Sequence, residues 1–142
     1  RVKNPRNQVT DQMLSVEPLT VEFEYELAAD ITGLRVGIYV MTSRGEYIFT
    51  SFDTDDPDKF QQFSTRKAGH YISSCSIPAD TFNEGRFVIG LNASSYLVKR
   101  YFGDERAINF NINATGAPGM HWVEIRHGPT RPRLDWKIEE IA

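Results

Sequence analysis

The sequence feature that most constrains the fold is a strict alternation of apolar and polar residues over positions 18–27. One parity carries Leu19, Val21, Phe23, Tyr25 and Leu27, and the other carries Thr20, Glu22, Glu24 and Glu26. Successive side chains of a β-strand point to opposite faces, so this run predicts a strand with one buried and one solvated face. Three glutamates exclude a second packed layer on the solvated side, and the run therefore indicates an antiparallel sheet that forms half of a sandwich.

Comparable runs recur along the chain and are separated by turn residues. They predict further strands at 34–42, 46–52, 69–77, 86–92, 107–113 and 134–138, with 122–126 as a candidate edge segment. Asp56-Pro57 predicts the start of a short helix, and residues 94–105 read as a long aromatic connection. The expected fold is all-β: an immunoglobulin-like antiparallel β-sandwich of about seven to eight strands.

Length and charge limit the possible partners. The 142 residues suffice for one domain, which we place at 15–142 after a polar linker at 1–14. Because the chain starts at Arg1 without a methionine, we expect it to be a domain of a longer protein. A net charge of −3 argues against nucleic acid, and the lack of an apolar stretch of about 18 residues predicts no membrane insertion. The single Cys75 cannot form an internal disulfide and favours a reducing compartment.

Motifs for catalysis, cofactors and metals are not found in the sequence. The acidic run 53–58 resembles a calcium loop but lacks the glycine and distal glutamate of an EF-hand, which favours a helix cap with solvated charge. The histidines lack zinc-site spacing, and neither a GxSxG elbow nor a P-loop occurs. We therefore expect no enzyme activity in this chain, no cofactor and no metal. A small hydrolase that uses scattered carboxylates is the least favoured alternative.

The expected solvent face of strands 34–42, 86–92 and 107–113 is polar, with an aromatic residue. Asparagine offers both a donor and an acceptor to sugar hydroxyls, and tyrosine offers a flat face to the apolar side of a pyranose ring. Exposed loop aromatics, Trp122 among them, suit either a ligand or a partner subunit. Solvated filler is the alternative reading of the asparagines. The candidate glycan-binding residues are Tyr39, Arg86, Asn92, Asn109, Asn111 and Trp122.

Seven stretches, in this order, resemble the C-terminal carbohydrate-binding domain of Wzt, the nucleotide-binding subunit of ABC transporters that export bacterial O-antigen polysaccharide. They are PLTVEFEY (18–25), LRVGIY (34–39), GEYIF (45–49), GHYISSCSIP (69–78), FNEGRF (82–87), INF (108–110) and RPRLDW (131–136). The resemblance covers most of the chain, roughly residues 15 to 140.

The resemblance implies an immunoglobulin-like sandwich without catalytic activity, preceded by an ATPase domain. It implies a cytoplasmic location at the inner face of the bacterial inner membrane, and binding to the non-reducing end of a lipid-linked polysaccharide. The full-length protein would join the membrane subunit of the transporter, and the domain would form a homodimer, in some members by exchanging the last strand, here 134–138. The alternative is a β-sandwich for protein–protein interaction or dimerisation that binds no sugar.

Overall fold

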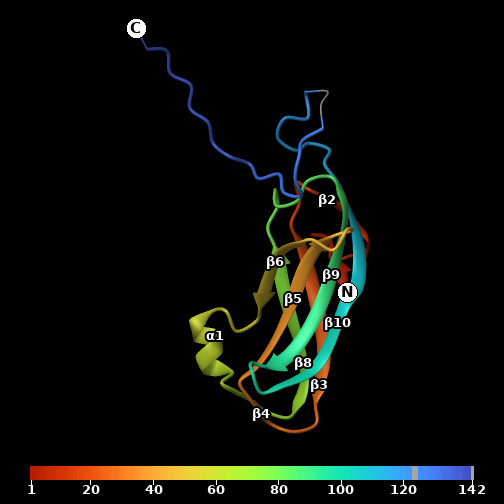
Figure 1. Ribbon diagram of the computed structural model, residues 1–142, viewed down its shortest axis with the longest axis vertical. Helices are drawn as coiled ribbons and strands as arrows, with labels where there is room; N and C mark the ends of the chain where they lie inside the picture. Colours follow the sequence, from red (N-terminus) through yellow and green to blue (C-terminus); the bar gives the residue numbers. More distant parts are fainter. Residues whose placement is uncertain (123–124, 142) are drawn as a thin grey trace.

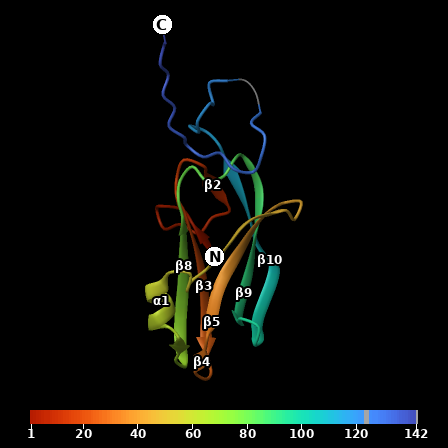
Figure 2. The same ribbon diagram turned by 60° about the vertical axis from the view of Figure 1, so that its left-hand side comes forward.

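Two β-sheets lie face to face in the computed structural model, which describes residues 1–122 and 125–141. One layer is a three-stranded sheet in the order β1-β3-β8, and the other is a five-stranded sheet in the order β2-β10-β9-β5-β6 (Figures 1 and 2). The first contains β1 (Val2–Lys3), β3 (Leu19–Leu27) and β8 (Gly69–Ile77). The second contains β2 (Gln12–Leu14), β5 (Leu34–Thr42), β6 (Tyr47–Phe52), β9 (Gly85–Ser95) and β10 (Lys99–Asn113). The predicted all-β sandwich is confirmed.

Most neighbouring strands are antiparallel, as expected. Strands β3 and β8 pair without a shift from Leu19↔Ile77 to Leu27↔Gly69. The exception is β2, which runs parallel to β10 and makes the larger sheet mixed. A small ladder of β4 (Ile31–Thr32) with β7 (Thr65–Arg66) closes one end of the sandwich.

The alternation in β3 has the predicted consequence. Leu19 and Val21 are buried between the sheets, whereas Glu24 and Glu26 are exposed. Glu22 pairs with Lys3 at 2.9 Å and also with Arg1, so the amino-terminal strand covers the start of the glutamate face. Hydrogen bonds and charge from Arg1 and Lys3 lower the pKa of Glu22.

Aromatic side chains fill the core at the end of the sandwich near the carboxyl terminus. Phe82, on the connection after β8, packs 4.8 Å from Phe87 and 5.5 Å from Phe110, measured between ring centroids. All three rings are buried, and the tilted and edge-on arrangements are those that aromatic pairs favour.

One helix, α1 (Pro57–Gln62), lies outside the sandwich beside its open edge (Figure 1). Asp56 accepts a hydrogen bond from the Asp58 backbone N–H, and Pro57 occupies the first turn, as the sequence predicts. Within the described residues, no helix is both long and apolar enough to cross a membrane.

The expected polar linker at 1–14 is not separate from the sandwich. Val2 and Met13 are buried core residues, and their strands β1 and β2 pair with β3 and β10. Strands of two and three residues are too short to show an alternating pattern, which explains why the sequence presents this segment as a linker.

The predicted aromatic connection at 94–105 is also wrong. Strand β9 continues to Ser95 and β10 begins at Lys99, so these residues form one long hairpin. Its outer half is exposed, and the pattern of buried apolar residues that marks a strand is missing there.

The carboxyl-terminal strand expected at 134–138 does not form within the single chain. Residues 132–141 are an exposed tail that leaves the sandwich at one end (Figure 1). The candidate edge segment at 122–126 falls partly on residues 123–124, which lie outside the described residues, and the rest of it forms no strand.

Candidate functional site

An aromatic row covers the outer face of the five-stranded sheet. The Tyr39 ring stands edge-on to Tyr47, with centroids 5.9 Å apart, and edge-on to Phe52 at 6.4 Å. Strand pairing sets this row, because Tyr47 and Phe52 flank Tyr39 from β6. Gly37 is required beneath it, since a Cβ at that position would overlap the Phe52 ring.

A cation continues the row toward the β9–β10 hairpin. The Arg35 guanidinium carbon lies 4.0 Å from the centroid of Phe52 and 4.7 Å from that of Tyr96. The Arg35 Nε atom is buried and finds no hydrogen-bond partner among the described residues. Stacking on two rings therefore holds the guanidinium in place.

A groove of about 320 Å³ lies beside Tyr39 on this face. The opposite wall is β10, where the register shifts between Asp104 and Ile108. This irregular stretch approaches β9 closely because Gly90 lies beneath it, and a Cβ at that position would be 3.0 Å from the Glu105 carbonyl oxygen. The groove is lined by Tyr39, Tyr47, Leu91, Asn92, Arg100, Gly103, Asp104 and Glu105.

Two of the predicted residues meet in this groove. Tyr39 forms part of one wall, and the buried Asn92 lies on the neighbouring strand opposite Gly37. The Ser94 hydroxyl donates a 2.8 Å hydrogen bond to Asn92 Oδ1 and orients the amide. The sequence does not reveal Arg100, Asp104 and Glu105 as groove residues, because its pattern predicts a connection at 94–105 and not a strand beside Asn92.

Three other predicted residues gather farther along the same face. Arg86 is paired with Asn111, and its Nε donates a 3.4 Å hydrogen bond to Asn111 Oδ1. Asn109 is exposed two residues away on β10. Arg86 is four positions from Gly90 along β9, roughly 13 Å at the rise of a strand. Arg86, Asn109 and Asn111 therefore form a cluster separate from the groove.

Trp122 lies apart from both groups. It is exposed in the loop after β10, with the His121 ring 5.5 Å away. The sequence could not place this loop relative to the sheet face.

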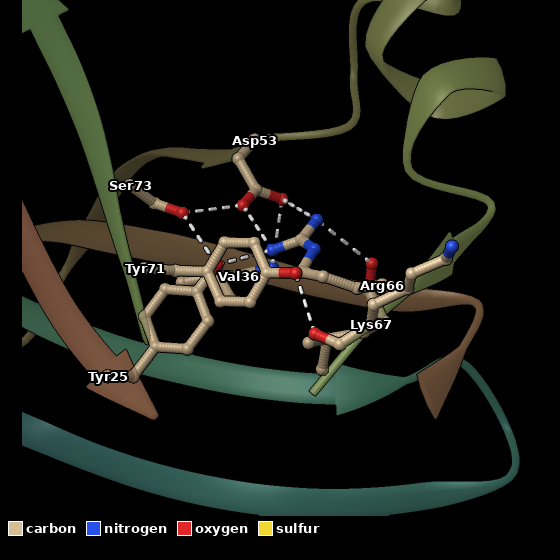
Figure 3. Close-up of polar contacts among 8 residues, drawn as sticks. Tyr25, Val36, Asp53, Arg66, Lys67, Tyr71 and Ser73 are labelled. Carbon is tan, nitrogen blue, oxygen red and sulfur yellow. Dashed lines mark hydrogen bonds and ion pairs between the residues drawn. The ribbon is translucent and has the colours of Figure 1, made fainter. Parts of the chain in front are cut away.

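A second cavity, of about 410 Å³, lies at the open edge of the sandwich, between β8 and β6. Its polar wall centres on Arg66, whose side chain is only 3% exposed. Arg66 Nη1 donates to Asp53 Oδ2 at 2.8 Å and to the Tyr25 hydroxyl at 2.6 Å (Figure 3). Burial alone would lower the pKa of Arg66, but hydrogen bonds and charge from Asp53 outweigh burial and raise it.

Further contacts brace this ion pair. Ser73 Oγ donates to Asp53 Oδ2 at 2.8 Å, and the Tyr71 ring stacks on Tyr25 with centroids 5.6 Å apart (Figure 3). The first residue of the acidic run is thus the partner of a buried arginine, while Asp56 caps α1. Among residues 1–122 and 125–141, no group of three or more His, Cys, Asp or Glu side chains could hold a metal ion.

Comparison with known proteins supports the fold through structure and not through sequence. No protein-family model matches the sequence, and no curated protein matches it. Among solved structures, the chain is similar to the one described as the crystal structure of the C-terminal domain of Wzt, with a TM-score of 0.73. That match has 10% sequence identity and covers 97% of this chain and 80% of the other. The chain therefore has the fold of the Wzt C-terminal domain, as its sequence resemblance predicts.

Proposed function

We propose that this chain is a non-catalytic carbohydrate-binding domain that recognises the non-reducing end of O-antigen polysaccharide for export by an ABC transporter. The observation that carries the proposal is the groove beside Tyr39, where an aromatic wall faces amide and charged groups across the outer sheet. Shallow sites with one flat apolar wall and several polar groups suit sugars. The likeness to the Wzt C-terminal domain supports the same conclusion.

The groove offers complementary contacts for a pyranose ring. The Tyr39 and Tyr47 rings are inclined at 77° to each other, so each presents a different surface to the ligand. The carboxylates of Asp104 and Glu105 accept hydrogen bonds from sugar hydroxyls, and the amide of Asn92 both donates and accepts. Binding at a single open groove is expected to be weak, with a Kd on the order of mM to μM.

The remaining predicted residues would serve a longer ligand. Arg86, Asn109 and Asn111 lie on the same face beyond the groove, where a polysaccharide that follows β9 would reach them. Trp122 would contribute only if the glycan continued past the end of the sheet. We retain all four as proposed contacts and give Tyr39 and Asn92 the central role.

The transporter setting follows from the family resemblance. In this proposal an ATPase domain precedes Arg1, and the full-length protein joins the membrane subunit at the cytoplasmic face of the inner membrane. The ligand is then a lipid-linked polysaccharide awaiting export. The sandwich supplies recognition, and the chemistry of ATP hydrolysis belongs to the other domain.

We further propose a homodimer that exchanges residues 134–138. Leu134, Trp136 and Ile138 share one parity and are all exposed on the tail, which is the pattern of a strand without its sheet. In the described chain β8 pairs with β3 alone, so its other edge is free to accept a strand. The cavity along this edge, about 410 Å³ in volume, offers space for apolar side chains.

The same exposed tail favours one alternative function, a protein-interaction or dimerisation module that binds no sugar. The two functions differ in their response to glycan, because only the first requires the groove.

Saturation-transfer NMR with the O-polysaccharide of the source organism tests the proposal. We expect transfer to the terminal sugars, loss of transfer in Tyr39→Ala, and retention in Phe60→Ala, which removes an exposed aromatic ring from α1. Both variants should keep the thermal midpoint within a few degrees. Absence of transfer to wild-type protein, together with a mass that rises with concentration, would establish the interaction module instead.

A further inference from the structure

The tip of the β9–β10 hairpin exposes two aliphatic side chains. Leu97 is 89% exposed and Val98 is 82% exposed, between strands that end at Ser95 and begin again at Lys99. The turn is closed by a 2.9 Å hydrogen bond from the Val98 N–H to the Ser95 carbonyl. Figures 1 and 2 place this hairpin at the opposite end of the sandwich from the carboxyl terminus.

The backbone conformation at Leu97 does not favour a leucine at this position of the turn. Its φ is +60°, a left-handed conformation that favours glycine or asparagine and disfavours a residue with a branched apolar side chain. The exposed side chain adds no packing within the described chain to offset this strain. Strain of this kind at an exposed apolar residue points to a contact outside the chain.

The aliphatic tip is followed directly by two cations. Lys99 and Arg100 come after Val98, Tyr101 follows them, and Tyr96 precedes Leu97. Lys99 Nζ lies 5.0 Å from the Tyr101 ring centroid, and no acidic residue occurs between Ser94 and Gly103. A membrane surface suits an exposed aliphatic tip beside cations, because the aliphatic groups enter the acyl region and the cations meet anionic headgroups.

We propose that this hairpin tip is a peripheral membrane contact that inserts Leu97 and Val98 into a bilayer with anionic headgroups. A bilayer fits better than an apolar protein groove, because the charged residues next to the tip, Lys99 and Arg100, are both cations and cations attract anionic lipid. The contact is independent of glycan binding. It also departs from the expectation of no membrane insertion, which rests on the lack of a spanning segment and does not address a two-residue tip.

The contact would orient the proposed glycan groove. Ser95 Oγ donates to the Thr32 carbonyl at 3.1 Å, which ties the hairpin to β4 and fixes its direction. Arg100 belongs to both the hairpin and the groove lining, so insertion of the tip would hold the groove beside the membrane surface.

Co-sedimentation with vesicles tests the proposal. The 142-residue chain is mixed with vesicles of phosphatidylcholine alone or of phosphatidylcholine and phosphatidylglycerol in equal amounts. We expect binding to the anionic vesicles that weakens with salt, and a drop of about tenfold in the double variant Leu97→Asn/Val98→Ser. Asparagine suits the left-handed turn, so the thermal midpoint of this variant should stay unchanged or rise. Ile125→Asn removes an equally exposed aliphatic residue from the other end and should bind as wild type does.

Backbone NMR of the labelled chain with the same vesicles identifies the contacting surface. Broadening confined to residues near 96–101 supports the proposal. Absence of binding at millimolar lipid, equal binding by the double variant, or broadening on another face would overturn it. The proposal is also overturned if, without lipid, the molar mass of the wild-type protein rises with concentration and that of the double variant does not. The tip is then an interface between copies of the chain. Because glycan binding is measured separately, failure here leaves the proposed carbohydrate function intact.

Discussion

Arg66 Nη1 lies 2.8 Å from Asp53 Oδ2, joining β7 to the residue that follows β6 across the open edge of the sandwich. The arginine is almost fully buried, and the carboxylate also accepts a 3.1 Å hydrogen bond from the Val36 backbone N–H. One ion pair therefore links the five-stranded sheet to the small β4–β7 ladder.

Asp53→Asn should lower the free energy of unfolding by about 3 kcal/mol, because it leaves the Arg66 charge buried without its partner. Urea denaturation measures this change. Asp58→Asn, which alters an exposed carboxylate of the same acidic run, should change it by less than about 0.5 kcal/mol. Equal effects of the two substitutions would show that the ion pair adds no stability.

Gly37→Ala should destabilise the fold by about 1–3 kcal/mol, because the added methyl group overlaps both the Phe52 ring and the backbone carbonyl oxygen of Ser51. Displacement of that ring also removes the support of Tyr39 and Arg35. Thermal unfolding of Gly37→Ala, Phe52→Ala and the double variant tests this explanation through the loss of stability in each. The double variant should lose less stability than the sum of the two single changes, although the overlap with the Ser51 carbonyl oxygen remains, and strict additivity would contradict a clash with the Phe52 ring.

Cys75 should react slowly with iodoacetamide at pH 8, because burial raises the pKa of its thiol and reduces the thiolate fraction. The rate should increase with pH beyond the range where an unperturbed thiol is already ionised. The raised pKa also links the free energy of unfolding to pH. The contribution of the neutral Cys75 thiol to that free energy is present below the unfolded-state pKa and declines as the pH rises through the folded-state pKa. Mass spectrometry follows the modification, and a rate equal to that of a free cysteine peptide would contradict the burial effect.

Asn83→Ala should release the segment that leads to the tail. The buried Asn83 amide donates 2.8 Å hydrogen bonds to the carbonyl oxygens of Arg126 and Gly128, and its backbone N–H donates to Pro129. Loss of the amide should cost about 1–3 kcal/mol and increase trypsin cleavage at Arg126 and Arg131. Asn109→Ala, an exposed asparagine on β10, is the matched control and should leave both properties unchanged.

The long strands could be predicted because their faces differ in environment. In β3 one face is buried and the other solvated, and the glutamates record that difference at every second position. In β5 the inner positions Leu34, Val36, Ile38 and Val40 are all buried, in agreement with their spacing. Tyr39 could be placed on the outer face for the same reason.

The remaining features depend on contacts that leave no periodic trace. Strands β1 and β2 span too few residues, and the outer half of the β9–β10 hairpin buries too little, to produce alternation. The pairing of Asp53 with Arg66 joins positions brought together by the fold and separated in the sequence by a helix. Residues 134–138 do alternate, but within one chain no sheet receives them.

Anchoring by Asn83 also sets a length scale for assembly. Arg131 is held by a 2.9 Å hydrogen bond from its Nε to the Pro118 carbonyl, and Arg133 Nε lies 3.1 Å from Asp80 Oδ2. The free tether therefore begins at residue 134, and its described part, 134–141, contains eight residues. Fully extended, such a tether reaches at most about 29 Å. A neighbour that takes up the tail must therefore dock within that radius, and two grooves joined in this way would be held at a restricted spacing. A pair of domains would then bind most tightly to two glycan ends whose separation matches the spacing of the two grooves.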